Sequence, residues 1–124
     1  MKAFKKLTLA VVVAIITVSA NASDECKTAA DIAKKVMTDR QNGVTIVEAL
    51  DDVDSYLDKS VIYIVNKYDR EEAELYRGRA YTEADTARRL IPIAYKMSLY
   101  HDKYYREAMI NEFVNKVYLS CEKK

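Results

Sequence analysis

Turn-forming residues are scarce in this chain of 124 residues, which has two Gly and one Pro, and Trp is absent. All-β architectures need turn residues about every 8–12 positions, so this scarcity argues against them. An excess of one charge is also missing, because 20 Lys and Arg stand against 19 Asp and Glu. A strongly basic nucleic-acid-binding protein is therefore excluded, and the length indicates a single domain.

Long apolar runs are absent apart from one near the N-terminus. Three lysines among the first six residues precede an uncharged apolar run at residues 7–18, and Ala20-Asn21-Ala22 follows it. This order is typical of a secretory signal peptide, and the run is shorter than the roughly 20 residues that span a membrane. We therefore predict a signal peptide at residues 1–22 and a single helical domain at residues 23–124. The mature chain is expected to have no membrane span and to be periplasmic or secreted.

The only two cysteines, Cys26 and Cys121, lie near the two ends of the expected domain. An even number of cysteines in an exported chain favours a disulfide. Their separation excludes the Cys-x-x-Cys spacing of a thioredoxin-like site, and two Cys with one His are too few for a zinc site, which needs about four such ligands. We predict an intramolecular Cys26–Cys121 disulfide and a monomer, with a bridge between two copies as the alternative.

Apolar residues recur at intervals of three and four through most of the domain, which is typical of amphipathic helices. The first helix is expected to end before Gly43, and Thr45 with Glu48 has the spacing of a capping box that begins the next. That helix is expected either to continue or to pass to a new one near Ser55. Residues 61–65 are rich in β-branched side chains, but a lone strand would have no partner, so we predict a helix there as well.

Two residues are expected to interrupt the second half of the domain. Gly78 is predicted to end a helix and Thr82 to cap the next one, in which Pro92 would introduce a kink. The last helix is expected to begin at Asp102 and run to about Cys121, with the most regular apolar face in the chain. We therefore predict an all-α fold, a small bundle of four to five helices in which one disulfide joins the N- and C-terminal helices.

Three short patterns resemble segments of a known group of proteins. They are Arg40-Gln41-Asn42-Gly43 at a helix end, Leu90-Ile91 with Ala94-Tyr95 in mid-chain, and a C-terminal pattern formed by Ile110, Phe113, Asn115, Tyr118, Leu119 and Cys121. Together with Cys26 after a signal peptide, they make the chain similar to small exported all-helical proteins of phages, prophages and gamma-proteobacteria. The resemblance leaves out residues 58–86, which look like an insertion, and it implies no catalytic residues.

Candidate reactive groups are few. His101, the single histidine, lies next to Asp102, but no nucleophile pattern accompanies the pair and Cys121 is expected to be oxidised. The acidic cluster at residues 51–58 lacks the glycine and the bidentate glutamate of a calcium-binding loop. We expect that cluster to be a solvated helix face, with an acidic docking patch for a basic partner as the alternative. The protein is expected to have no catalytic residues, no metal site and no cofactor.

Tyrosine is the one residue type in clear excess, with ten copies, all of them after residue 22. Tyr100, Tyr104 and Tyr105 gather with His101 near the start of the last helix. Tyrosine combines a large apolar ring with a polar tip, so it suits both the edge of a core and a binding interface. Both interpretations stay open, and the candidate binding surface is formed by Tyr100, His101, Tyr104 and Tyr105.

These patterns favour a non-enzymatic protein that acts by binding another macromolecule. The expected partner is a protein of the cell envelope, and the expected role is regulation or inhibition of an envelope process, which the resemblance connects with phages or prophages. Nucleic acid is not an expected partner, because the domain without its signal peptide has a small excess of acidic residues. The alternative function is that of a periplasmic acid-stress chaperone.

Overall fold

The computed structural model describes residues 22–123, so the predicted signal peptide, apart from Ala22, lies outside the described residues. The described part forms four helices and no strand: α2 (Ala22–Gln41), α3 (Ile46–Lys67), α4 (Arg70–Tyr95) and α5 (Lys103–Glu122). The predicted all-α bundle is confirmed. None of these four helices is long and apolar enough to cross a membrane.

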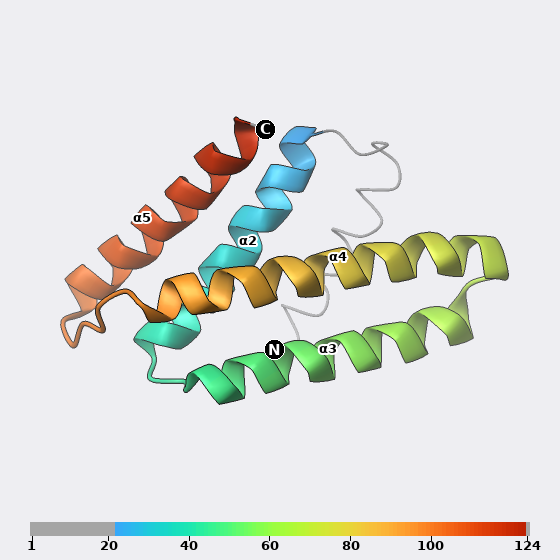
Figure 1. Ribbon diagram of the computed structural model, residues 1–124, viewed down its shortest axis with the longest axis horizontal. Helices are drawn as coiled ribbons and strands as arrows, with labels where there is room; N and C mark the ends of the chain where they lie inside the picture. The colour runs from blue at the N-terminus through green and yellow to red at the C-terminus, as the bar shows by residue number, and fades with distance from the viewer. Residues whose placement is uncertain (1–21, 124) are drawn as a thin grey trace.

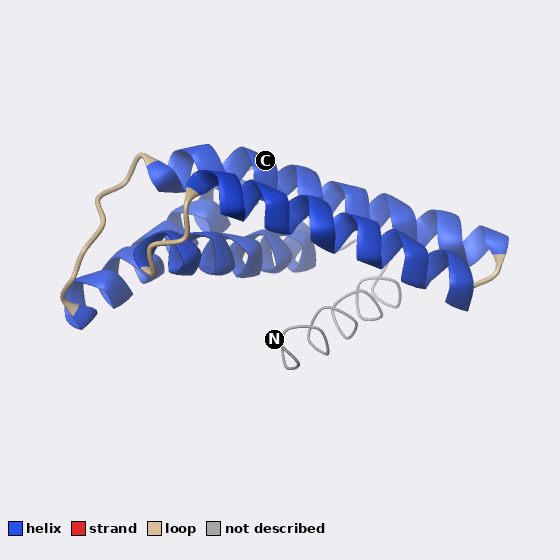
Figure 2. Cartoon of the chain, turned by 90° about the horizontal axis from the view of Figure 1, so that it is seen from below, coloured by secondary structure: helices blue, strands red, loops and turns tan. Residues whose placement is uncertain are grey.

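The four helices pack as two antiparallel pairs (Figure 1). α3 and α4 form a long hairpin, and α5 packs against α2. α2 also packs against the C-terminal half of α4, which joins the two pairs, while the turn between α3 and α4 extends away from α2 and α5 (Figure 1). The longest of the loops in the described part, residues 96–102, connects α4 to α5 (Figure 2).

Side-chain caps fix where the helices begin. Thr45 and Glu48 form the predicted capping box, in which the Thr45 hydroxyl accepts a hydrogen bond from Glu48 N at 3.1 Å. The Asp102 carboxylate accepts a hydrogen bond from Tyr104 N at 2.8 Å and so caps α5. Gly43 has a φ of +83°, a left-handed conformation that glycine adopts without strain, and it ends α2 as predicted.

The prediction that Gly78 ends a helix is wrong. α4 runs through Gly78 and Thr82, and the Thr82 hydroxyl donates a hydrogen bond to Gly78 O at 2.9 Å instead of capping a new helix. Glycine in a helix costs about 1 kcal/mol relative to alanine, whereas burying one large apolar side chain contributes about 1.5–3 kcal/mol. The free energy gained by burying Tyr76 and Ala80 on the face toward α3 therefore exceeds the cost of having glycine in the helix. Pro92 also lies within α4, which continues beyond it to Tyr95.

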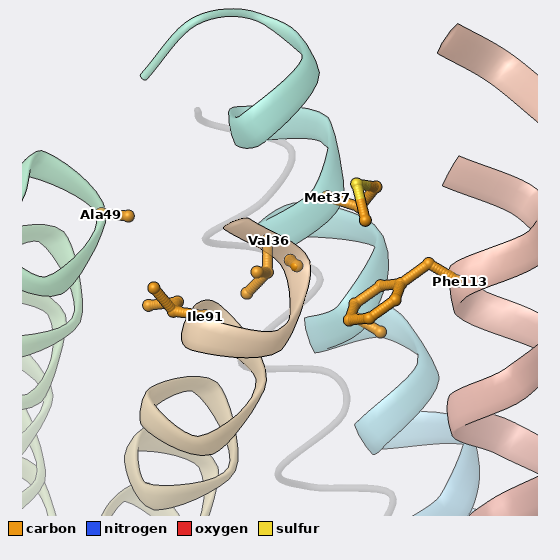
Figure 3. Packing of buried hydrophobic residues seen from close by; sticks show 7 residues of the cluster. Val36, Met37, Ala49, Ile91 and Phe113 are labelled. Carbon is orange, nitrogen blue, oxygen red and sulfur yellow. The ribbon is translucent and has the colours of Figure 1, made fainter. Parts of the chain in front are cut away.

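Two clusters of buried side chains form the core. One lies where α2, α3, α4 and α5 meet, and in Figure 3 Ile91 of α4 points toward α3, which carries Ala49, while the Phe113 ring points from α5 toward α2. The other lies along the α3–α4 hairpin and contains Leu57, Ile64, Ala73, Tyr76, Ala80 and Ala84. Small side chains recur every seven residues along α4, at Ala73, Ala80, Ala87 and Ala94. This spacing keeps alanine on the buried face of α4, where it allows neighbouring helices to approach closely.

α5 buries much less than its regular apolar pattern suggested. Phe113 is its only buried residue, and Met109, Ile110, Val114 and Val117 are partly buried. The physical reason is that α5 packs mainly against one helix, α2, so most of its circumference stays in contact with solvent.

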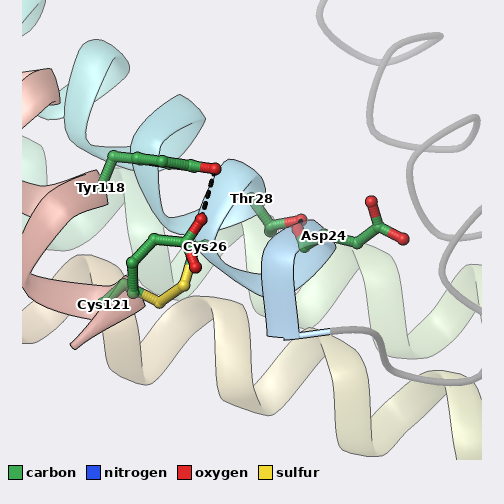
Figure 4. Close-up of a disulfide and its surroundings, with 6 residues drawn as sticks. Asp24, Cys26, Thr28, Tyr118 and Cys121 are labelled. Atoms are coloured by element: carbon green, nitrogen blue, oxygen red, sulfur yellow. Dashed lines mark hydrogen bonds between the residues drawn. A yellow bond between two sulfur atoms is a disulfide. The ribbon is translucent and has the colours of Figure 1, made fainter. Parts of the chain in front are cut away.

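The predicted disulfide joins Cys26 near the start of α2 to Cys121 near the end of α5, with their Cα atoms 5.5 Å apart (Figure 4). Cys26 is 1 % exposed, so the bridge enters the packed interior at the α2 side. No free cysteine remains among the described residues. The bond fixes the end of α5 to the start of α2 covalently, where α5 itself contributes few buried contacts.

We expect the double substitution Cys26→Ser and Cys121→Ser to lower the free energy of unfolding by about 4–5 kcal/mol, because it reopens a loop spanning nearly the whole domain. Urea unfolding of the oxidised protein and of the variant measures this change. Hydrogen exchange should show that the amides of α5 lose protection before those of α3 and α4. Chemical reduction of the unsubstituted protein is the matched control and should have the same effect. Unchanged protection of α5 after reduction would contradict the prediction.

Candidate functional site

The loop between α4 and α5 is fastened to the end of α2 by a buried amide. Gln41, which is 4 % exposed, donates a hydrogen bond from Nε2 to Ser98 O at 2.8 Å. Its Oε1 accepts a hydrogen bond from Tyr100 N at 2.9 Å. One side chain therefore satisfies a backbone acceptor and a backbone donor of the loop, and it fixes the backbone on which Tyr100 lies.

The residues beside Gln41 extend this attachment. Arg40 donates a hydrogen bond from Nη2 to Met97 O at 3.0 Å, and its guanidinium lies 5.3 Å from the centre of the Tyr95 ring. Asn42 accepts a hydrogen bond at Oδ1 from Nη2 of Arg106 in α5. The Arg40-Gln41-Asn42 segment thus connects α2 to the loop and to the first turns of α5. No local pattern in the sequence predicts this role.

The predicted surface residues do lie together, with Tyr100 and His101 on this loop and Tyr104 and Tyr105 in the first turn of α5. The Tyr100 and Tyr105 rings are 6.0 Å apart between centroids, and the Tyr104 and Tyr105 rings are 5.4 Å apart in an edge-to-face arrangement. Tyr104 is 74 % exposed and Tyr105 is 57 % exposed, while Tyr100 is half-buried. The interpretation that these rings close the core is therefore wrong for Tyr104 and Tyr105. We call Tyr100, His101, Tyr104 and Tyr105 the tyrosine surface.

His101 is exposed, and the carboxylate beside it already has a structural task. Asp102 accepts hydrogen bonds from the backbone nitrogens of Tyr104 and Tyr105, at 2.8 and 3.4 Å, as the N-cap of α5. A general base of the His–Asp kind needs a carboxylate that orients the imidazole. Both bonds use Oδ1, and among the described residues no hydrogen bond or ion pair joins Asp102 to the His101 ring, which is an exposed polar member of the tyrosine surface.

Other tyrosines pack in the core or at its edge, which was the alternative interpretation of the tyrosine excess. The Tyr76 ring is buried and stacks on Tyr68 with centroids 4.2 Å apart in the hairpin. Tyr95 donates a hydrogen bond from its hydroxyl to Val44 O at 2.7 Å, and burial raises the pKa of this hydroxyl above its ordinary value. Tyr76 and Tyr95 therefore pack at the core or its edge, whereas Tyr104 and Tyr105 at the start of α5 are exposed to solvent.

The acidic cluster on α3, formed by Asp51, Asp52, Asp54 and Asp58, is exposed. Asp54 forms an ion pair with Arg88 of α4 at 2.8 Å. Within residues 22–123, no three His, Cys, Asp or Glu side chains are grouped so that they could hold a metal ion. The cluster is thus an exposed face of the hairpin that is partly neutralised by α4.

Glu83 is the most deeply placed carboxylate of the hairpin. Its Oε1 accepts a hydrogen bond from the Tyr56 hydroxyl at 3.2 Å, whereas its Oε2 is buried without a hydrogen-bond partner in the described part of the chain. Burial raises the pKa of Glu83 above its ordinary value, although the Tyr56 hydroxyl and the charge of Arg79 act in the opposite direction. The charged carboxylate is therefore disfavoured where it lies, between α3 and α4.

Comparisons of the chain with family models, with curated proteins and with solved structures found no match. The functional argument therefore depends on the geometry of the site. That geometry consists of exposed aromatic rings in the first turn of α5, next to a loop that a buried amide fixes, which is an arrangement suited to recognition of another surface.

We expect Glu83→Gln to stabilise the protein at about pH 7 and to have much less effect at about pH 4, measured by urea unfolding. A raised pKa means that the folded state binds the proton more readily than the unfolded state does. The protonated carboxyl therefore favours folding at low pH, and this contribution is lost as pH rises through the folded-state pKa. Glu74→Gln, which alters an exposed carboxylate of the same helix, is the control. Destabilisation by Glu83→Gln at neutral pH would contradict this account.

We expect Gln41→Ala to lower the free energy of unfolding by about 1–3 kcal/mol, because Ser98 O and Tyr100 N would both lose their partner. Tyr104→Ala should change it by less than about 0.5 kcal/mol, because that ring is mostly in water. Thermal or urea unfolding of the two variants measures both values. A large loss of stability for Tyr104→Ala would show that this ring packs in the core.

Proposed function

We propose that this protein is a small exported, non-enzymatic binding protein that regulates or inhibits a process of the cell envelope through the tyrosine surface. The observation that carries the proposal is the exposure of Tyr104 and Tyr105 in the capped first turn of α5. Their rings contact each other, the Asp102 cap holds the backbone nitrogens of both residues, and Gln41 holds the preceding loop at Tyr100.

The physical advantage of such a surface is preorganisation. An aromatic side chain buries a large area on binding and loses little rotamer freedom, since it has only two side-chain torsions. A loop that is already ordered adds little further entropy loss when a partner binds. The edge-to-face contact between Tyr104 and Tyr105 restricts the rings further before any partner arrives.

Export is supported by two independent features. The first is the order of charged, apolar and small residues in the predicted signal peptide at residues 1–22. The second is the Cys26–Cys121 disulfide, a bond that persists in oxidising compartments such as the periplasm or the outside of the cell. We therefore propose a periplasmic or secreted monomer, and the resemblance to exported phage and prophage proteins suggests that setting for the partner.

The absence of enzymatic activity is also part of the proposal. Both cysteines are bonded to each other, so the described residues offer no thiol nucleophile. Among the described residues, no hydrogen bond or ion pair joins the carboxylate of Asp102 to the His101 ring. No cofactor is proposed, and neither nucleic acid nor lipid is proposed as the partner, because positive and negative charges are nearly balanced.

The alternative, a periplasmic acid-stress chaperone, requires a fold that loosens in acid and exposes apolar surface. Protonation of the carboxylates would leave a large excess of positive charge that favours loosening. Glu83 acts in the other direction, because its protonation favours the contact between α3 and α4. Binding through the tyrosine surface ranks first because of the exposure of Tyr104 and Tyr105 on an ordered backbone.

The test is a photo-crosslinking amino acid introduced at Tyr104 or, in a separate variant, at Tyr81, in cells that produce the protein. Tyr81 is the matched control, since it is 49 % exposed but lies in α4 away from the tyrosine surface. We expect a discrete crosslinked product from position 104 and none from position 81. With the partner identified, Tyr104→Ser should weaken binding at least about tenfold, as is usual for a central aromatic contact, whereas Tyr81→Ser should not.

Two outcomes would contradict the proposal. One is equal crosslinking from both positions, which would indicate nonspecific contact. The other is suppression of acid-induced client aggregation at near-equimolar ratio, absent at neutral pH, which would favour the chaperone alternative.

A further inference from the structure

A shallow groove of about 350 Å³ lies between α2 and the first two turns of α5. Its lining comes from Thr38 of α2, from Asn42 directly after α2, and from four residues of α5, namely Lys103, Arg106, Glu107 and Ile110. The α5 residues are spaced by three and four, so they share one side of the helix. The groove is thus built from two helices whose relative position the Arg106–Asn42 hydrogen bond fixes.

The charges in this groove are not neutralised by ion pairs. Lys103 and Arg106 form no salt bridge with any described residue, and neither does Glu107. Arg106 donates from Nη2 to the neutral amide oxygen of Asn42, which orients the guanidinium but leaves its charge uncompensated. Two cations and one anion therefore give the groove a net charge of about +1.

We infer that this groove binds a single carboxylate carried by a peptide segment, next to an aliphatic side chain. A planar guanidinium held at one nitrogen can still present other N–H groups to a carboxylate, and Lys103 adds a second charge nearby. Glu107 disfavours a doubly charged phosphate more strongly than a singly charged carboxylate. Ile110, which is half-buried and packs against the core, offers an apolar contact for the aliphatic neighbour.

The groove and the tyrosine surface share the first two turns of α5. Tyr104 follows Lys103 directly in the chain, and Tyr105 precedes Arg106, so the rings leave the same turn on other sides of the helix. If the proposed function holds, the carboxylate belongs to the partner of the tyrosine surface, and this part of the inference rests on the proposed function. The existence of the carboxylate site does not rest on it, since the site involves none of the tyrosine rings.

The test is a nuclear magnetic resonance titration of the ¹⁵N-labelled, disulfide-bonded protein with a short probe, acetyl-isoleucyl-glutamate amide. We expect saturable shifts of the Asn42, Lys103 and Arg106 amide signals at about millimolar concentration, which is usual for a ligand of this size. The glutamine version of the probe should give no saturable shift. A probe with a free C-terminal carboxylate, acetyl-isoleucyl-isoleucine, shows whether the preferred source is a chain end or an acidic side chain.

Single variants separate a binding role from a structural one. Lys103→Gln should weaken probe binding about fivefold, and Glu107→Gln should strengthen it about threefold, because each removes one charge from the lining. Lys116→Gln is the matched control, since Lys116 lies in α5 outside the groove and pairs with Glu112. Tyr104→Ser should leave probe binding unchanged, which distinguishes failure of this inference from failure of the proposed function.

The inference would be overturned by any of three results. The first is equal binding of the glutamate and glutamine probes. The second is tighter binding of inorganic phosphate than of the carboxylate probes. The third is an affinity that Lys103→Gln and Glu107→Gln leave unchanged.

Discussion

α5 is held at both of its ends, and the presentation of the tyrosine surface depends on this double attachment. At one end the Cys26–Cys121 disulfide fixes it covalently to the start of α2. At the other end Gln41 and Asn42, where α2 finishes, hold the preceding loop and Arg106. A helix that buries only Phe113 would otherwise gain too little from packing to keep a single position.

This arrangement explains how exposed rings can lie on an ordered backbone. Burial usually fixes aromatic side chains, but burial would remove Tyr104 and Tyr105 from any partner. Here the backbone is fixed by a buried amide and a helix cap, so the rings remain in solvent on an ordered frame. The charged groove on the same turns of α5 shares this frame, because Asn42 orients Arg106 from α2.

Local signals in the sequence were sufficient to predict those features that depend on residues close together in the chain. The caps at Thr45 and Asp102 and the stop at Gly43 follow from short-range chemistry, and the two cysteines allowed only one intramolecular pairing. Gly78 was misjudged because the contact of α4 with α3 outweighs local propensity. The role of Gln41 was not predictable, since it depends on where a loop almost sixty residues away passes α2. The exposure of Tyr104 likewise depends on which side of α5 meets α2.

The α3–α4 hairpin has a core that is separate from the junction with α2. Its buried residues lie between residues 57 and 84. Antiparallel helices with a seven-residue alanine spacing can be lengthened together without disturbing the helices that pack beyond them. A hairpin extended in this way would leave α2, α5 and the loop between α4 and α5 in place. The unpartnered Oε2 of Glu83 lies in this hairpin, so the free-energy cost of burying it affects the hairpin and leaves the backbone that carries the tyrosine surface unchanged.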